Sequence, residues 1–243
     1  MRIGFALPNI GPVATPEAVI AVAERAEQLG YDSLWTIERL LYPVKLQRPY
    51  PVTADGSLPE VYKHALDPLE ALTFAAARTR KIALGTSVID IPYYNPVMLA
   101  RRLITLDFLS KGRVRVGLGL GWSKDEVDAT GGDFKQRGAM ADEFLQVLKA
   151  IWTTNPVKFH GKFYQVPESY IGPKPVQKPP PHLHGGLCTT GAKAPGQVRR
   201  WLESSGYSAG RHGTDVRFNQ AAREGSGARS VTYRAGHPGT SRN

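Results

Sequence analysis

The stretch from Lys81 to Trp122 constrains the fold more than any other part of this chain. It contains two apolar runs, IALGTSVI and RVRVGLGLG, which flank a segment that Pro96 opens at a favoured first-turn position of a helix. The pattern predicts a strand, a helix and a second strand. Because two strands joined through a helix lie parallel and adjacent, we expect functional groups where these strands end and their loops begin.

The residues before this stretch show the same alternation. A short apolar strand is predicted over 2–7, a helix over 16–29 that Gly30 ends, and a second strand over 31–37. The order strand, helix, strand is the repeating unit of a parallel sheet or barrel, so the whole first portion of the chain is expected to be α/β.

The residues after Trp122 continue the pattern less regularly. Segment 123–136 is polar and predicts a loop, and the apolar spacing over about 138–152 predicts a helix. A small hairpin is predicted over 157–166, and a brief fifth strand, HLH, over 182–184.

The segment from Glu38 to about Leu66 is the longest interruption of the pattern. It is rich in Pro and Tyr, and it is too long for a plain connection to the helix that starts at Asp67-Pro68. Since it leaves the carboxyl end of a strand, where parallel α/β proteins place their sites, we favour a lid over a surface loop without function.

The cysteine content and the N-terminal residues indicate in which cellular compartment the protein is expected. The single cysteine, Cys188, excludes an intramolecular disulfide and a cysteine-based zinc cluster. Met1 is followed at once by a predicted strand, and we find no signal peptide and no membrane span. The expected location is therefore cytoplasmic, and the 42% hydrophobic content of the 243 residues permits one large domain.

The net charge of +10 is unevenly distributed along the chain. Residues 1–186 carry 22 Lys and Arg against 18 Asp and Glu, whereas residues 187–243 carry 9 against 3. The first portion is therefore near balance, and a nucleic-acid partner would depend on the tail alone. We expect no specific nucleic-acid partner and no membrane association.

Four quoted motifs together resemble one family. They are EQLGYDSLW, the Lys81 to Trp122 run with Glu126 four residues later, VKFHGKFYQV and KPPPHLHGG. The combination resembles the luciferase-like monooxygenase superfamily, and within it the branch that uses the deazaflavin coenzyme F420 rather than FMN. The resemblance covers about residues 1–186, and its most specific part is the run LD-x-L-S-x-GR-x-x-x-G-x-G-x-GW.

The resemblance implies a (β/α)8 barrel with a flavin or deazaflavin ring across the carboxyl ends of its strands. The implied activity is F420-dependent hydride transfer with a small organic substrate, or the FMN-dependent monooxygenase alternative, in which the protein orients rings and supplies protons. In relatives a non-proline cis peptide bond forms a bulge after the third strand, and the matching bond here is Ser87-Val88. The implied cofactor-binding residues are Thr86, Ser87, Val88, Asn95, Gly119, Gly121 and Trp122. For Asn95, turn chemistry before Pro96 is an equally simple explanation.

Glu38, Arg39 and Glu126 are the candidate catalytic residues. Relatives often carry an acid and a histidine just after the second strand, where this chain has Glu38-Arg39, so a carboxylate held by its neighbouring arginine is expected instead of a histidine base. Glu126, after the fourth strand, is the second candidate proton carrier. The alternative for both glutamates is a solvated loop charge.

Two other patterns do not predict a site. Gly117, Gly119 and Gly121 are spaced G-x-G-x-G, which lacks the final x-x-G of a dinucleotide-binding loop. His182 and His184 share a face of the predicted fifth strand, but the sequence offers no third ligand nearby, so no metal is expected.

The last 57 residues, 187–243, do not continue the alternation of strands and helices. They contain no Ile and no Met, six Leu, Val and Phe in total, eight Arg and nine Gly. By His184 the chain has about four βα units and the start of a fifth, and completing a barrel would need on the order of 100 further residues. We therefore predict an incomplete TIM-barrel type α/β fold over 1–186, followed by an irregular, basic and disordered tail.

Two explanations of this tail remain open. One is a basic disordered segment that binds nucleic acid or acidic surfaces, and the other, which we favour, is a coding frame lost near Gly186. Barrels commonly hold phosphate groups in the loops after the seventh and eighth strands, which this chain is expected to lack. We therefore expect truncation to weaken binding of F420 or FMN and to remove activity, and open strand edges to favour self-association.

Overall fold

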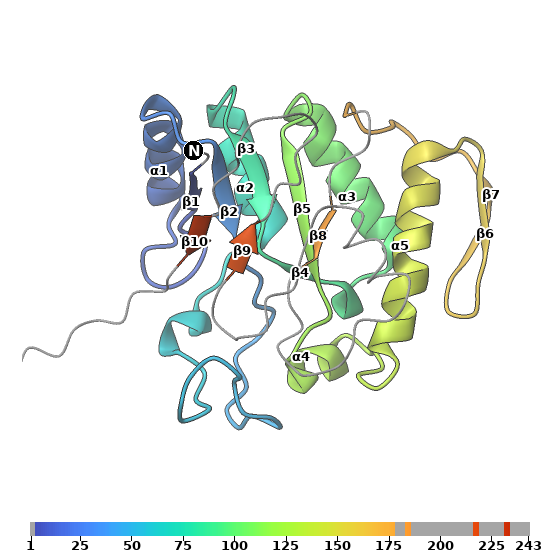
Figure 1. The fold of residues 1–243 in the computed structure, drawn as a ribbon, viewed down its shortest axis with the longest axis horizontal. Coiled ribbons are helices and arrows are strands. Elements are labelled where there is room, and N and C mark those ends of the chain that lie inside the picture. The colour runs from blue at the N-terminus through green and yellow to red at the C-terminus, as the bar shows by residue number, and fades with distance from the viewer. Residues whose placement is uncertain (1–2, 178–182, 186–215, 219–230, 234–243) are drawn as a thin grey trace, which may run out of the picture.

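The computed structural model describes residues 3–177, 183–185, 216–218 and 231–233. At its centre is a parallel sheet in which β1, β2, β3 and β5 lie side by side, with β4 and β8 each paired to β5 (Figure 1). The strands are β1 (Gly4–Ala6), β2 (Ser33–Thr36), β3 (Ala83–Thr86), β4 (Ile89–Asp90), β5 (Val114–Gly119) and β8 (Leu183–Gly185).

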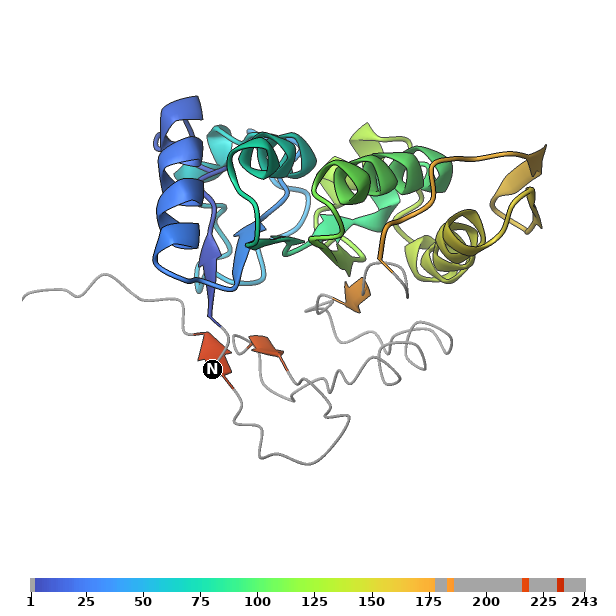
Figure 2. The ribbon, with the colours of Figure 1, turned by 90° about the horizontal axis from the view of Figure 1, so that it is seen from above.

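Helices alternate with these strands along the chain, and α1, α2 and α3 lie along one face of the sheet (Figure 2). The helices are α1 (Pro16–Gln28), α2 (Pro68–Arg78), α3 (Pro96–Leu109), α4 (Lys124–Ala129) and α5 (Arg137–Thr153), with the 3-10 helices η1 (Glu60–Lys63) and η2 (Ile91–Tyr93). Neighbouring helices pack on one another in the order α1, α2, α3, α5, as expected for the outer layer of a barrel.

Three of the helices begin in the same way. The side chains of Thr15, Asp67 and Asn95 each accept a hydrogen bond from the first turn of the helix, and each is followed by a proline at the first helical position. The cap satisfies backbone N–H groups that have no partner within the helix, and the proline has no N–H to satisfy. The predicted starts of α1, α2 and α3 are confirmed.

The register of the strands places one row of side chains in the core. Leu34 of β2 is aligned with Leu84 of β3, which is aligned with Val114 of β5, and all three are buried. The parallel β3–β5 pairing confirms the adjacency predicted from the central stretch. With β1 and β8, the described residues supply five parallel barrel strands, which confirms an incomplete barrel of four to five βα units.

The predicted hairpin is also present, as β6 (Val157–His160) and β7 (Gln165–Ser169) in antiparallel pairing around Gly161. Glu143 of α5 holds its turn, because the carboxylate accepts hydrogen bonds from the backbone N–H groups of Phe163 and Tyr164 at 2.9 and 2.6 Å. The hairpin therefore packs outside the sheet, against α5, and does not extend the barrel.

The prediction of a plain polar loop over 123–136 is wrong in its first part, which forms α4. Ser123 caps this helix by accepting a hydrogen bond at Oγ from Glu126 N at 3.3 Å. The pattern S-x-x-E, which favours a helix start, was the signal in the sequence. The helix is too short to show an apolar period, so its polar composition suggested a loop.

Asp107, in the most specific motif of the sequence, ties α3 to the segment that leads to β8. Its carboxylate is completely buried and accepts hydrogen bonds from Val176 N, Gln177 N and Gln177 Nε2 at 2.7, 3.3 and 2.6 Å. Gln177 Nε2 also donates to the carbonyl of Val114 at the start of β5. Asp107 therefore aligns the incoming chain with the sheet and has a structural role.

Within the predicted tail, the structure describes one antiparallel pair, β9 (Val216–Phe218) with β10 (Val231–Tyr233). The rest of 187–243 lies outside the described residues, so the boundary near Gly186 and the disorder of the tail stay predictions. His182 also lies outside them, and only the backbone of His184 is described, within β8. No helix in the described part of the chain is long and apolar enough to cross a membrane.

Candidate functional site at the strand ends

The predicted cis peptide bond between Ser87 and Val88 is present. It separates β3 from β4, so the chain bulges at the carboxyl end of the third barrel strand. The backbone N–H of Ser87 donates to the carbonyl of Thr36 in β2 at 2.7 Å. The Ser87 side chain is exposed and Val88 is half-buried, so both are accessible at the end of the strand.

The glycines of β5 allow this bulge to pack closely. A Cβ on Gly117 would lie 2.1 Å from the carbonyl oxygen of Thr86, and one on Gly119 would lie 2.4 Å from Asp90 Oδ1 and 2.6 Å from Val88 Cγ2. Thr86 Oγ1 also exchanges hydrogen bonds with Gly117 N and O, both at 2.9 Å. The space beside Gly119 is therefore filled by the chain itself, and Val88 is the side chain that lies over it.

Glu38 follows β2 and is buried, with 6% of its surface exposed, so it is not a solvated loop charge. Its carboxyl oxygens accept hydrogen bonds from the Tyr94 hydroxyl and from Asp90 N, the latter at 2.7 Å. Burial raises the pKa of Glu38 to about 8, against the lowering effect of these two hydrogen bonds. Glu38 is therefore predominantly protonated at neutral pH.

Arg39 does not hold the Glu38 carboxylate, so that prediction is wrong. Its Nη1 lies 2.9 Å from Glu126 Oε2, and its Nε donates only to the backbone carbonyl of Glu38 at 2.7 Å. The two side chains make separate contacts, because the Glu38 carboxyl is taken by Tyr94 and Asp90 N whereas Arg39 finds the carboxylate of Glu126. Burial lowers the pKa of Arg39, but Glu126 and the weaker contributions of Tyr93, Asp90 and Tyr50 together outweigh it, so the net shift is upward.

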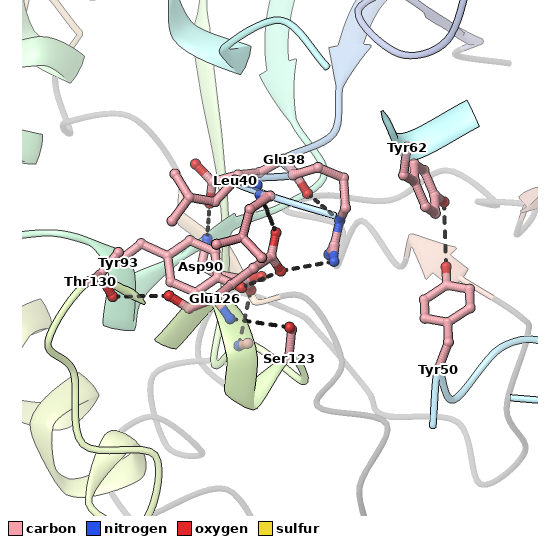
Figure 3. A network of polar contacts seen from close by, with 12 residues as sticks. Glu38, Leu40, Tyr50, Tyr62, Asp90, Tyr93, Ser123, Glu126 and Thr130 are labelled. Atoms are coloured by element: carbon pink, nitrogen blue, oxygen red, sulfur yellow. Dashed lines mark hydrogen bonds and ion pairs between the residues drawn. The ribbon is translucent and has the colours of Figure 1, made fainter. Parts of the chain in front are cut away.

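Glu126 is fully buried and lies at the centre of the polar network in Figure 3. Besides Arg39, its carboxylate accepts hydrogen bonds from the Tyr93 hydroxyl at 2.9 Å, Leu40 N at 2.6 Å and Leu41 N at 3.3 Å. A carboxylate has about four lone-pair sites, and all are used here. Glu126 therefore anchors the start of the long loop to α4, and the solvated-charge alternative is wrong for it as well.

Asp90 is a site residue that the sequence reasoning missed. Its Oδ1 accepts a hydrogen bond from Gly121 N at 3.0 Å. The φ of +67° at position 121 lies in the left-handed region, which favours glycine. Burial raises the pKa of Asp90 to about 6, although the charge of Arg39 opposes the shift. The signal available was its place as the first charged residue after the apolar run of the third strand.

Trp122 joins the network through aromatic contacts. The Arg39 guanidinium carbon lies 5.3 Å from the Trp122 ring and 5.6 Å from the Tyr62 ring. Tyr50 contacts both rings, at centroid distances of 5.0 Å to Trp122 and 6.1 Å to Tyr62. Since Tyr50 and Tyr62 belong to the long loop after β2, that loop is packed against the strand ends, where a lid is expected.

Asn95 does not join the polar network and caps a helix instead. Its Oδ1 accepts hydrogen bonds from Val97 N and Met98 N at 2.9 and 3.4 Å, which is the capping of α3. No group of three or more His, Cys, Asp or Glu side chains in the described part of the chain is arranged to hold a metal ion.

The sequence model of the luciferase-like monooxygenase family matches residues 1–229. The chain belongs to this family. The match extends past Gly186, where the resemblance of the quoted motifs ends. A coding frame lost near Gly186 therefore stays a prediction.

Relatives of this luciferase-like chain include proteins of both cofactor types. An uncharacterised protein of Mycobacterium tuberculosis is 39% identical over 190 residues, which are 78% of this chain and 66% of the relative. An F420-dependent glucose-6-phosphate dehydrogenase of Amycolatopsis mediterranei is 30% identical over 70% of this chain and 48% of its own length. An FMNH2-dependent dimethylsulfone monooxygenase of Pseudomonas putida is 32% identical over 54% of this chain and 37% of its own length.

Solved structures agree on the fold of the luciferase-like chain. The monooxygenase RslO1 of Streptomyces bottropensis superposes with a TM-score of 0.63 at 26% identity, over 76% of this chain and 53% of that protein. An F420-dependent secondary alcohol dehydrogenase superposes with a TM-score of 0.59 at 24% identity, over 76% and 51%. The chain thus spans between about half and two thirds of the length of most of these relatives, and 37% of the length of the dimethylsulfone monooxygenase.

Proposed function

We propose that this chain supplies one half of the cofactor site of an F420-dependent oxidoreductase acting on a small organic substrate. The observation that carries the proposal is the bulge at Ser87-Val88, packed on the glycines of β5 beside a buried, protonated Glu38. The F420-dependent relative aligns with 70% of this chain, against 54% for the FMNH2-dependent one, which favours F420. FMN-dependent monooxygenation is the second candidate, because relatives of both kinds exist.

The residues present fit the ring of either cofactor. We use the name ring-binding face for the strand ends formed by Thr86, Ser87, Val88, Gly119, Gly121 and Trp122. Ser87 and Val88 are accessible there, and the close packing of Gly119 against Val88 and Asp90 fixes the surface on which a flat ring would lie. When bound, the cofactor would supply the hydride or oxygen chemistry of its ring.

The three candidate catalytic residues then have different roles. Glu38 carries a proton at neutral pH and contacts the Tyr94 hydroxyl, so it is the group that would hold or deliver a proton. Glu126 has every acceptor site occupied by Arg39, Tyr93 and two backbone N–H groups, so it would position Arg39 and the long loop. Arg39 would face the ligand with the edge of its guanidinium that Glu126 does not use.

A comparison of FMN with riboflavin tests the ring-binding face separately from a phosphate clamp. Loops after a seventh and eighth strand are not among the described residues, and we propose that this chain lacks them. Riboflavin has the same ring as FMN but no phosphate, so both should bind with equal and weak affinity in a fluorescence titration, and F420 should bind weakly too. Much tighter binding of FMN than of riboflavin would show a clamp, and micromolar binding of F420 or FMN by a monodisperse sample would do the same.

The same titration decides the proposed function as a whole. No saturable binding of F420, FMN or riboflavin at any concentration tested would contradict the ring-binding face. Light scattering on the sample also tests self-association, which we propose because β1 and β8 each have one partner strand among the described residues. A clean monomer would contradict that part.

A further inference from the structure

Two hydrogen-bond donors beside the ring-binding face lack an acceptor in the described part of the chain. The indole Nε1 of Trp122 is buried and makes no hydrogen bond there. The guanidinium of Arg39 uses Nε on the Glu38 carbonyl and Nη1 on Glu126, and Nη2 has no partner among the same residues. A buried donor without an acceptor, such as Trp122 Nε1, is rare in folded proteins and needs an explanation, whereas the Arg39 side chain keeps some exposure to solvent.

The Arg39 guanidinium lies over the indole ring of Trp122, within a group of aromatic side chains. Arg39, Trp122, Tyr50 and Tyr62 form a closed cycle of contacts, with distances of 5.0 to 6.1 Å between neighbouring groups. The side chain of Arg39 is only 11% exposed, because Glu126 covers one edge and the rings lie against it. The edge that carries Nη2 is therefore the part of the guanidinium left for a ligand.

Trp152 shows why the combination matters more than a single unpartnered indole. Its Nε1 is also buried without a hydrogen bond among the described residues, but Trp152 lies in α5 and belongs to the hydrophobic core. Among the described residues, no cationic side chain lies over the Trp152 ring as Arg39 lies over that of Trp122. At the strand ends, by contrast, a cationic guanidinium lies over the same indole that carries the unpartnered N–H.

We propose that Arg39 and Trp122 together bind an acceptor oxygen, the carbonyl or carboxylate oxygen of a small compound with a flat or apolar body. Guanidinium and indole N–H groups donate and cannot accept, so a cation or a pure donor would not be recognised. Tyr50 and Tyr62 supply the apolar wall that such a body would contact. The location rests on the proposed function, because the oxygen belongs either to the substrate or to the carbonyl edge of the cofactor ring.

The indole resonances of the full chain, labelled with ¹⁵N-tryptophan, test the proposal without any assay of activity. Trp122→Phe assigns the Trp122 signal, and F420, FMN, riboflavin and pyruvate are then added separately. We expect a downfield shift of the Trp122 N–H signal with at least one of them. Trp35, whose Nε1 already donates to Ser33 Oγ at 2.8 Å, and Trp152, which lies in the core, are internal controls that should not move.

Variants measure the same contact through affinity. Trp122→Phe keeps an aromatic ring, though a smaller one, and removes the N–H, so the ligand that shifts the signal should bind about threefold to tenfold more weakly. Arg39→Lys keeps a charge opposite Glu126 but loses the planar fork, and a similar or larger loss is expected. Trp152→Phe is the matched control and should bind as the parent does. If Arg39→Lys fails to fold, Trp122→Phe and the resonance shift decide.

The outcomes distinguish a cofactor oxygen from a substrate oxygen. They also distinguish failure of the donor pair from failure of the ring-binding face. A shift with FMN and riboflavin identifies the ring carbonyl, and a shift with pyruvate alone identifies a substrate oxygen. The donor pair is wrong if none of the four compounds moves the Trp122 signal, or if they bind and Trp122→Phe keeps full affinity. A shift with pyruvate together with no binding of F420, FMN or riboflavin would support the donor pair and overturn the ring-binding face.

Discussion

Arg39 pairs with Glu126, a residue 87 positions away, and not with Glu38, its neighbour in the chain. The distance from Nη1 to Oε2 is 2.9 Å, and both side chains are withdrawn from solvent. This pair joins the residue after β2 to the helix after β5, and so connects two strand ends that β3 separates in the sheet. It also frees Glu38 from a nearby positive charge, and the pKa of Glu38 rises as a result of its burial.

Glu126→Gln should be strongly destabilising, because it leaves the buried Arg39 guanidinium without its counter-charge. The expected loss in the free energy of unfolding is about 3–5 kcal/mol. Glu24→Gln is the control, since it breaks the more exposed Arg78–Glu24 pair, and its cost should be below about 1 kcal/mol. Urea unfolding followed by circular dichroism measures both. Similar losses for the two variants would contradict a central role for the Arg39–Glu126 pair.

The stability of the chain should fall as the pH rises from 4.5 towards about 8, through the titration of Glu38. The folded protein keeps a proton on this carboxyl up to its pKa of about 8, whereas the unfolded chain releases it near 4.5. The unfolded state then binds fewer protons, so its formation is favoured by higher pH. Glu38→Gln keeps a neutral side chain of the same shape and should flatten the profile in this window. A parent profile that rises there, or an unchanged slope in the variant, would rule this out.

Gly119→Ala should displace the bulge over β5. The added methyl would lie 2.4 Å from Asp90 Oδ1 and 2.6 Å from Val88 Cγ2, and overpacking of this kind costs about 1–3 kcal/mol. Gly172→Ala is the control, because a Cβ there meets no heavy atom within 4 Å. Urea midpoints give the stability, and riboflavin titration reports the ring-binding face. The account of Gly119 is wrong if both variants unfold at the same midpoint.

Asp107→Ala should release the segment that leads into β8. It leaves three donors on Val176 and Gln177 without their acceptor, at an expected cost of about 3 kcal/mol. Asp133→Ala is the control, since Asp133 accepts from Lys135 N and Gln136 N in the same way but is exposed. Hydrogen exchange at Val176 N is the local measurement, and it should accelerate in Asp107→Ala alone. Unchanged protection in that variant would show that another contact holds the segment.

Much of the fold was predictable because the signals are local. Each of Thr15, Asp67 and Asn95 stands one residue before a helical proline, and the apolar runs of β3 and β5 flank such a helix. Connection through a helix makes these strands parallel neighbours. The short helix α4 was missed because one capping box is a weaker signal than a repeated apolar period, although Ser123 and Glu126 carried it.

The candidate site was predictable in its position but not in its contacts. The resemblance placed Glu38, Arg39 and Glu126 at strand ends, and the structure brings them within one network (Figure 3). It also brings in Asp90 and Tyr94, whose importance depends on burial against residues far along the chain. Composition and spacing do not report which hydroxyl or backbone N–H reaches a given carboxylate.

Patterns that repeat within a few residues predict the order of the main strands and helices and the parallel pairing of β3 with β5, whereas the place of the bulge was implied by the resemblance to relatives. The assembled fold brings Arg39 to Glu126 and buries Glu38 so that it keeps its proton. Neither outcome follows from local patterns, because ion pairing and desolvation depend on three-dimensional surroundings. Segments 87 residues apart create those surroundings only when the sheet has assembled.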